Sequence, residues 1–202
     1  MQSHKLSLKF FADDTGAVNA LPSDTFLHVF HSWIQRQAFP GHLLIDVADY
    51  AHVPNGPGTV LVAHEANIHL DREEGVGLLY VRKQPVAGAT TFRERLAEVF
   101  RAALVAADKL QSDSDLLSIR FRTGDMVFRI NDRLLAPNTE ATFAAVSGDL
   151  QAFLAELFGS DVALEHRHDD PRRLFEVRIR PSAKRSVSDL LARLESPAAA
   201  AR

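Results

Sequence analysis

The sequence contains no cysteine, and no apolar run approaches the ~20 residues that a membrane-spanning helix needs. The first absence excludes disulfides, thiolate metal ligands, iron–sulfur clusters and a cysteine nucleophile within these residues. The formal net charge is −3 and the pI is near 6.3, so nothing draws the chain globally toward nucleic acid or anionic membranes. We therefore expect a soluble cytoplasmic protein that has neither nucleic acid nor a membrane as its partner.

Common catalytic motifs are absent as well. The chain has no Gly-x-Ser-x-Gly elbow, no dinucleotide fingerprint and no Walker motif. Gly75 and Gly77 fall in an expected hairpin rather than between a strand and a helix, so they do not form a dinucleotide site. These absences remove the simplest hydrolase and nucleotide-binding interpretations.

Hydrophobic spacing predicts a folded α+β protein. Hydrophobic residues make up 46% of the 202 residues and include thirteen phenylalanines, enough for a core. Period-two alternation predicts about eight mostly antiparallel strands, at Leu6–Phe10, Leu43–Tyr50, Thr59–Asp71, Leu78–Lys83, Ser118–Arg122, Met126–Arg133, Val162–His168 and Leu174–Arg180. Spacing of i, i+3 and i+4 predicts four helices, at Phe26–Ile34, Phe92–Leu110, Asn138–Phe158 and Val187–Leu194. Ser23 or Asp24 is the expected cap of the first helix.

The two halves of this element order resemble each other. Both read as strand, helix, strands and helix, and a proline precedes a helix start in each, at Pro22 and Pro137. We interpret this as a degenerate internal duplication; the alternative is chance recurrence of common strand–helix junctions. The polar run 111–115 separates an N-terminal half (1–111) from a C-terminal half (112–196), although the two could form one continuous domain. Residues 197–202 are expected to be a frayed tail.

Histidine and acidic residues are concentrated in the first half. Six of the nine histidines lie between His28 and His69, among carboxylates such as Asp46, Asp49 and Glu65. Imidazoles and carboxylates are the usual groups for acid–base catalysis and for binding divalent metals. We therefore expect the functional site in this segment.

The spacing excludes one zinc motif and leaves another metal site open. His64 and His69 are five residues apart on an expected strand, whereas the metalloprotease motif needs two histidines four apart on a helix. Asp46, His52 and His64 could instead bind Zn, Mn or Fe. The alternative is that the histidines are structural or solvated and that the protein has no cofactor.

Asp46 is the first catalytic candidate and Glu65 the second. Asp46 interrupts an apolar strand, where a buried carboxylate costs several kcal/mol unless it is paired. A raised pKa or a bound cation would give it a catalytic role. The alternative, which we favour, is that Asp46 pairs with Arg82 or His64 or simply faces solvent.

The loop Pro54–Gly58 joins two expected strands beside these residues. Its glycines permit positive φ and close approach of a ligand, although a structural turn explains them more simply. On the next expected strand, the even-numbered residues from Val60 to Leu70 should face the core. The odd-numbered residues from Glu65 to Asp71 should form a polar stripe on the other face. The candidate ligand-binding residues are Asp49, His52, Asn55, Gly56, Gly58 and His69.

Arginines alternate with apolar residues on the strands of the second half. They should project from one open sheet face if helices cover the other, and they could bind an anion or an acidic partner. We favour a solvated face balanced by Glu165, Glu176 and Asp132. The arginines are Arg120, Arg122, Arg129, Arg178 and Arg180.

These patterns favour a non-catalytic module that binds a small molecule or another protein, with self-association through sheet edges or long helices as a further expectation. The alternative is a metal-dependent hydrolase with its site near the Pro54–Gly58 loop. It would require Asp46, His64 and Glu65 to converge on one ion or water.

Overall fold

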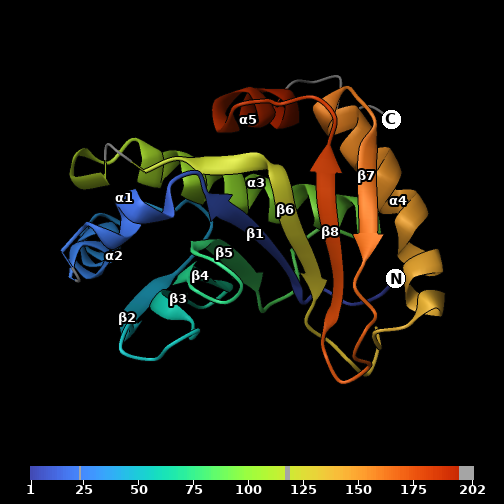
Figure 1. Ribbon diagram of the computed structural model, residues 1–202, viewed down its shortest axis with the longest axis horizontal. Helices are drawn as coiled ribbons and strands as arrows, with labels where there is room; N and C mark the ends of the chain where they lie inside the picture. The colour runs from blue at the N-terminus through green and yellow to red at the C-terminus, as the bar shows by residue number, and fades with distance from the viewer. Residues whose placement is uncertain (23, 117–118, 196–202) are drawn as a thin grey trace.

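The computed structural model describes residues 1–22, 24–116 and 119–195, and the strands of these residues form one sheet (Figure 1). Eight strands pair in the order β2-β3-β4-β5-β1-β6-β8-β7, and every neighbouring pair is antiparallel. The expected α+β class and strand number are therefore confirmed. The strands are β1 (Leu6–Ala12), β2 (Leu44–Tyr50), β3 (Gly58–Ala63), β4 (Ala66–Asp71), β5 (Gly77–Arg82), β6 (Phe121–Ile130), β7 (Val162–His166) and β8 (Phe175–Pro181).

Five α-helices occur among the described residues. The four expected helices are present, and a short additional helix, α1, follows β1. The helices are α1 (Thr15–Asn19), α2 (Thr25–Arg36), α3 (Phe92–Gln111), α4 (Glu140–Phe158) and α5 (Val187–Glu195). The cap expected at Ser23, the start of the strand expected from Ser118, and the expected frayed tail lie outside the described residues.

Local signals explain where the two long helices begin and end. Thr91 and Glu94 form a capping box that satisfies backbone N–H groups at the start of α3. The hydroxyl of Thr139 accepts a hydrogen bond from the Thr142 N–H at the start of α4, and Gly159, at φ 64°, ends that helix in the left-handed conformation.

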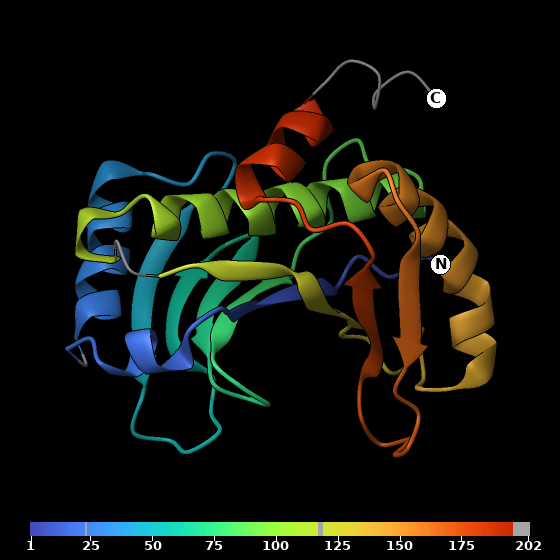
Figure 2. The same ribbon diagram turned by 45° about the horizontal axis from the view of Figure 1, so that its top comes forward.

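Helices pack on one face of the sheet, and α3 runs across its middle (Figure 2). The antiparallel registers align one row of side chains across all eight strands. Because the hydrophobic members of this row belong to the core, the row lies on the helix-covered face. The row is Val47, Leu61, Ile68, Tyr80, Leu8, Phe128, Val177 and His166. The adjacent row lies on the opposite, open face and consists of Ala48, Val60, His69, Leu79, Lys9, Val127, Arg178 and Glu165.

The single strand expected over Thr59–Asp71 is wrong, because the chain reverses at His64 and Glu65 to form the β3–β4 hairpin. Two contacts with Leu43 hold the turn: the His64 N–H donates to the Leu43 carbonyl, and a Glu65 carboxylate oxygen accepts from the Leu43 N–H. The expected face assignment therefore holds for β4 and fails for β3, where Leu61 enters the core instead of Val60.

The separation of the expected strands Ser118–Arg122 and Met126–Arg133 is also wrong, because β6 continues through residues 123–125. Between the pairs Phe10↔Met126 and Ala12↔Phe121 the register shifts, so β6 carries extra residues in an irregular bend rather than reversing. The Thr123 hydroxyl donates to the Arg185 carbonyl at 2.5 Å, which holds this bend against the segment before α5.

Candidate functional site

The residues proposed around β2 do not form a buried site. Asp46, Asp49, His52 and Asn55 are all exposed. The Asp46 carboxylate accepts a hydrogen bond from the Val47 N–H at 2.8 Å. Asp46 therefore faces solvent, as the alternative interpretation expected.

The glycines of the Pro54–Gly58 loop have a structural role. Gly58 has φ 64°, and a Cβ there would lie 1.9 Å from the carbonyl oxygen of Leu70. The backbone of β3 can approach β4 this closely only with glycine at that position. The structural-turn interpretation accounts for Gly58, and Gly56 likewise accepts a hydrogen bond from the Arg72 N–H within the same turn region.

Asp46 and His64 lie on opposite sides of the sheet. Asp46 pairs with Val62 and points to the open face, whereas Val47 beside it packs against the core. His64 lines a cavity on the helix side together with residues of α3. The convergence that a hydrolase built on both side chains requires is therefore not present.

The structure instead brings His64 and Glu65 together with His42 in one cavity of about 680 Å³. The cavity lies between the β3–β4 turn, the segments that precede β2 and α3, and the part of α3 from Glu98 to Val105. Its apolar lining includes Phe39, Val86, Ala102 and Val105, and its charged lining includes Arg82, Glu98, Arg101 and Glu195.

Hydrogen bonds fix the polar wall of this cavity. One ring nitrogen of His42 lies 2.8 Å from the Tyr80 hydroxyl and the other lies 3.1 Å from the Pro40 carbonyl oxygen. Burial lowers the pKa of His42, so the ring is neutral at pH 7. Burial alone would raise the pKa of Glu65, but the N–H groups of Leu43 and Glu65 itself and the nearby His42 and His64 outweigh it and lower the pKa. The wall is therefore a fixed neutral imidazole beside a carboxylate.

His69 is the most perturbed of the proposed residues. Both ring nitrogens are buried and have no hydrogen-bond partner among the described residues. Burial lowers its pKa to about 4; the nearby Pro57 carbonyl opposes this shift and Lys83 adds to it. His69 is thus neutral at pH 7 and contributes no charge to a site on the open face.

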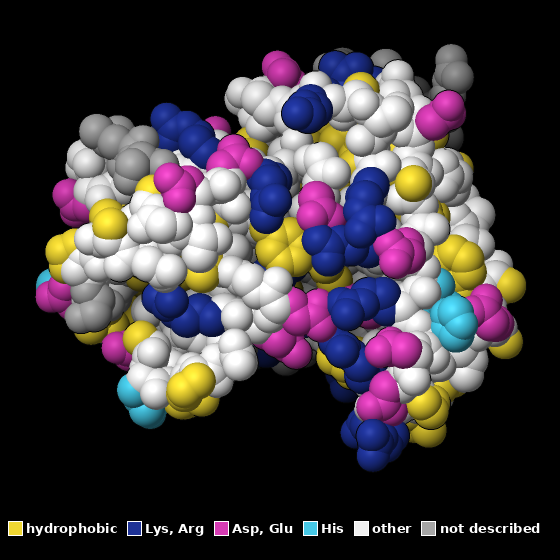
Figure 3. Space-filling view, in the orientation of Figure 1, with side chains coloured by type: hydrophobic (Ala, Val, Ile, Leu, Met, Phe, Trp, Pro, Cys, Tyr) yellow, Lys and Arg dark blue, Asp and Glu magenta, His cyan; other side chains and the backbone are white. Residues whose placement is uncertain are grey.

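The open face carries a paired charge network instead of free arginines. Figure 3 shows basic and acidic side chains interleaved over the region of β6 and β8. Arg129 contacts Glu176 at 2.5 Å and Glu73 at 3.1 Å, and Arg178 contacts Asp125 at 2.5 Å. The favoured balanced face is confirmed for these arginines, with Asp125 rather than Asp132 as a main partner.

The turn between β4 and β5 covers the centre of this face. Lys9, 1% exposed, donates from its ammonium group to the Asp71 carboxylate and to the carbonyls of Glu73 and Gly75. Glu74 on the same turn pairs with Arg167 and Arg173 of the β7–β8 connection. These contacts join the two halves of the chain across the open face.

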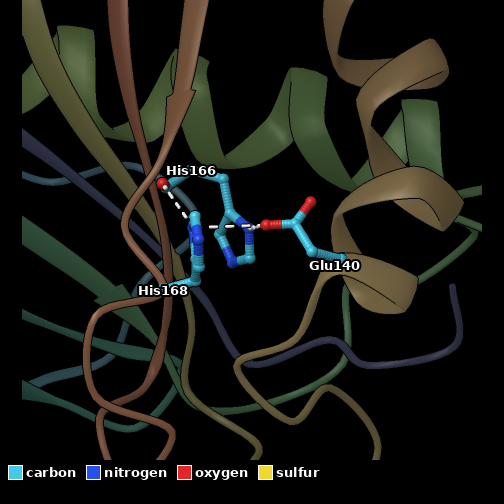
Figure 4. A group of neighbouring side chains, drawn as sticks. All are labelled: Glu140, His166 and His168. Atoms are coloured by element: carbon cyan, nitrogen blue, oxygen red, sulfur yellow. Dashed lines mark hydrogen bonds and ion pairs between the residues drawn. The ribbon is translucent and has the colours of Figure 1, made fainter.

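A second group of titratable side chains lies at the β7 edge, outside the segment that sequence reasoning selected. Glu140 at the start of α4, His166 at the end of β7 and His168 in the following loop place one ligand atom each within 4.8 Å of one another (Figure 4). The i, i+2 spacing of the two histidines was a signal in the sequence. Glu140, 26 residues earlier, was not connected to them by any local pattern.

Comparison of the chain with protein families, with curated proteins and with solved structures finds no match. Within the described residues, no helix has both the length and the hydrophobicity to cross a lipid bilayer. The functional argument consequently depends on the chain's own geometry.

Proposed function

We propose that this protein is a non-catalytic ligand-binding module whose site is the cavity between α3 and the β3–β4 turn. The observation that carries the proposal is the cavity itself. Its volume of about 680 Å³ lies within the range of small-molecule sites, about 300–1,000 Å³, and a few convergent polar groups interrupt its apolar wall.

The lining favours an amphipathic small molecule. Phe39, Ala102 and Val105 offer apolar contact, while Arg101 and His64 offer hydrogen-bond donors. Arg101 Nε is buried without a hydrogen-bond partner among the described residues and lies 3.6 Å from Glu98 as an ion pair. An acidic group on a ligand would give this guanidinium a better partner.

Binding of 8-anilinonaphthalene-1-sulfonate, an amphipathic anion, tests the proposal. Trp33 is the sole tryptophan and stacks on Phe39 of the cavity wall at 6.3 Å, so energy transfer from its fluorescence reports occupancy. We expect saturable 1:1 binding that weakens at least tenfold in Ala102→Phe, which fills the cavity. Ala145→Phe, on an exposed position of α4, is the matched control and should bind as the parent does. Equal binding by both variants would refute the cavity as the site.

Protein binding through the β2 edge is a second candidate. Strand β2 ends the sheet order, and Leu43, Ile45 and Tyr50 in or beside it are exposed, by 59%, 55% and 44%. An edge strand with exposed apolar side chains is a template for pairing with another chain, including a second copy. Light scattering after size exclusion should show self-association that Ile45→Lys abolishes; a monomer at all concentrations would contradict pairing between copies.

The cytoplasmic location stays a prediction.

We further propose that the two halves of the chain arose by a degenerate internal duplication. The first strands of the two halves, β1 and β6, are adjacent and antiparallel at the centre of the sheet. Such a pairing is what a two-fold axis normal to the sheet would produce. The extra strands β2 and β3 would then be an addition to the N-terminal half.

A further inference from the structure

The Glu140–His166–His168 group lies at the opposite edge of the sheet from the cavity and has the composition of a metal site. Figure 4 shows the Glu140 carboxylate, from the start of α4, directed at the two imidazole rings. Two histidines and one carboxylate are a common ligand set for Zn²⁺ and other first-row divalent metals.

Two of the three distances between ligand atoms match those that a metal ion would need, and all three are within 4.8 Å. A tetrahedral Zn²⁺ with bonds of about 2.0–2.1 Å holds its ligand atoms about 3.3 Å apart. One Glu140 carboxylate oxygen lies 3.2 Å from His166 Nδ1 and 3.2 Å from His168 Nδ1. The carboxylate oxygen is therefore already at ligand spacing from both rings.

Hydrogen bonding around His166 determines which of its nitrogens faces the carboxylate as a lone pair. The Asn138 side-chain amide, 3% exposed, donates its two N–H groups to the carbonyls of Arg167 and Asp170. Its oxygen, 3.0 Å from His166 Nε2, must then accept, so Nε2 carries the hydrogen. In the neutral ring, Nδ1 consequently presents a lone pair toward an oxygen that also carries lone pairs.

Packing holds His166 in this orientation. Its ring stacks on Phe143 at 5.1 Å with an interplanar angle of 7°, and Phe175 lies 5.1 Å away on β8. Metal-ligating histidines characteristically donate their other N–H to an oxygen acceptor, as His166 does to Asn138. A fixed ring with its lone pair aimed at a carboxylate is a preorganised ligand.

We propose that Glu140, His166 and His168 bind a Zn²⁺ ion, with water at the fourth position. The ion replaces the close approach of lone pairs between His166 and Glu140, and it replaces the contact of His168 Nδ1 with the His166 carbonyl oxygen, 3.3 Å away. Its three coordinate bonds join the start of α4 to the loop after β7. His168 and Glu140 have side chains 59% and 68% exposed, so the fourth position is open to solvent. The site shares no residue with the cavity, and either can fail without the other.

The test is a calorimetric titration of Zn²⁺ into untagged, chelator-treated full-length protein. We expect one ion per chain with a micromolar or tighter Kd, and Co²⁺ should give the visible absorption bands of four-coordinate Co²⁺. His168→Ala and Glu140→Gln should each weaken Zn²⁺ binding at least tenfold. Their exposed side chains keep folding intact, whereas His166→Ala would remove a packed ring. His52→Ala, an exposed histidine outside the group, is the matched control.

Two results would overturn the proposal. One is the absence of stoichiometric Zn²⁺ binding by the folded parent protein. The other is binding that persists in His168→Ala and Glu140→Gln alike, which would place the ion at another group of side chains.

Discussion

Breaking the buried pair of Lys9 and Asp71 should destabilise the fold strongly. Their side chains are 1% and 4% exposed, at the centre of the sheet where the β4–β5 turn closes over β1. Removing one partner of a buried ion pair leaves an uncompensated charge and costs about 3–5 kcal/mol. Asp71→Ala should therefore lower the free energy of unfolding by about this amount, which for a chain of this size is a fall in Tm of about 6–20 °C.

A double-mutant cycle separates the ion pair from the packing around it. Lys9→Met also leaves the carbonyl of Gly75 without its donor, 2.7 Å away, and should cost as much as Asp71→Ala. The double variant removes both charges, so its cost should be below the sum of the two single costs by about 2 kcal/mol or more. Urea unfolding followed by Trp33 fluorescence measures all three, because Trp33 is the sole tryptophan and is 2% exposed.

The pH dependence gives an independent check. Burial is the largest influence on Lys9 and lowers its pKa below 10.5, against the opposing effect of Asp71. The folded state thus binds this proton less tightly than the unfolded state, so stability falls as the pH drops from above 10.5 through the lowered folded pKa. In Asp71→Asn the carboxylate no longer raises the pKa of Lys9, so the fall in the free energy of unfolding extends to lower pH. An Asp71→Ala cost below about 1 kcal/mol with an unchanged m-value would refute the reasoning.

Two further predictions concern His69 in β4 and Gly58 at the start of β3. Burial lowers the pKa of His69 to about 4, so as the pH falls the unfolded chain takes up this proton before the folded protein does, and the free energy of unfolding should fall by about 3 kcal/mol between pH 6.5 and 4. His69→Gln should remove this pH dependence when unfolding is measured over the same pH range. An unaltered pH dependence would assign it to another group. Gly58→Ala should cost several kcal/mol in the free energy of unfolding, because φ is 64° and the new Cβ would meet the Leu70 carbonyl. Gly88→Ala, at φ 78° with open space around it, carries the backbone strain alone and should cost about 1 kcal/mol; equal costs would contradict the close contact.

Much of the fold could be predicted from local patterns, because periodicity and caps act within a few residues. The hydrophobic stripes of α2 and α3 and the alternation of β1 and β8 all appear in the structure. The failures occurred where local pattern and tertiary contact disagree. The turn at His64 and Glu65 contains neither glycine nor proline, and it depends on hydrogen bonds with Leu43, which lies just before β2.

The candidate site was harder to predict than the fold. The sequence grouped Asp46, His52 and His64 because they lie close along the chain, but the sheet separates Asp46 from His64. Conversely, no local pattern could bring Glu140 to His166 and His168, since the rest of helix α4 lies between Glu140 and the two histidines. Convergence of side chains depends on registers and layer packing, to which sequence spacing alone gives little access.

The sequence by itself determined the α+β class, the positions of the long helices and most strands, and the exclusion of cysteine chemistry, because composition and short-range periodicity are properties of the chain. Only the tertiary structure decided which carboxylates are buried, that Arg129 and Arg178 are paired with acidic residues, and that a cavity forms beside α3. Those features arise from contacts between strands and helices far apart in the chain, so they exist only after the sheet registers and the helix layer are in place.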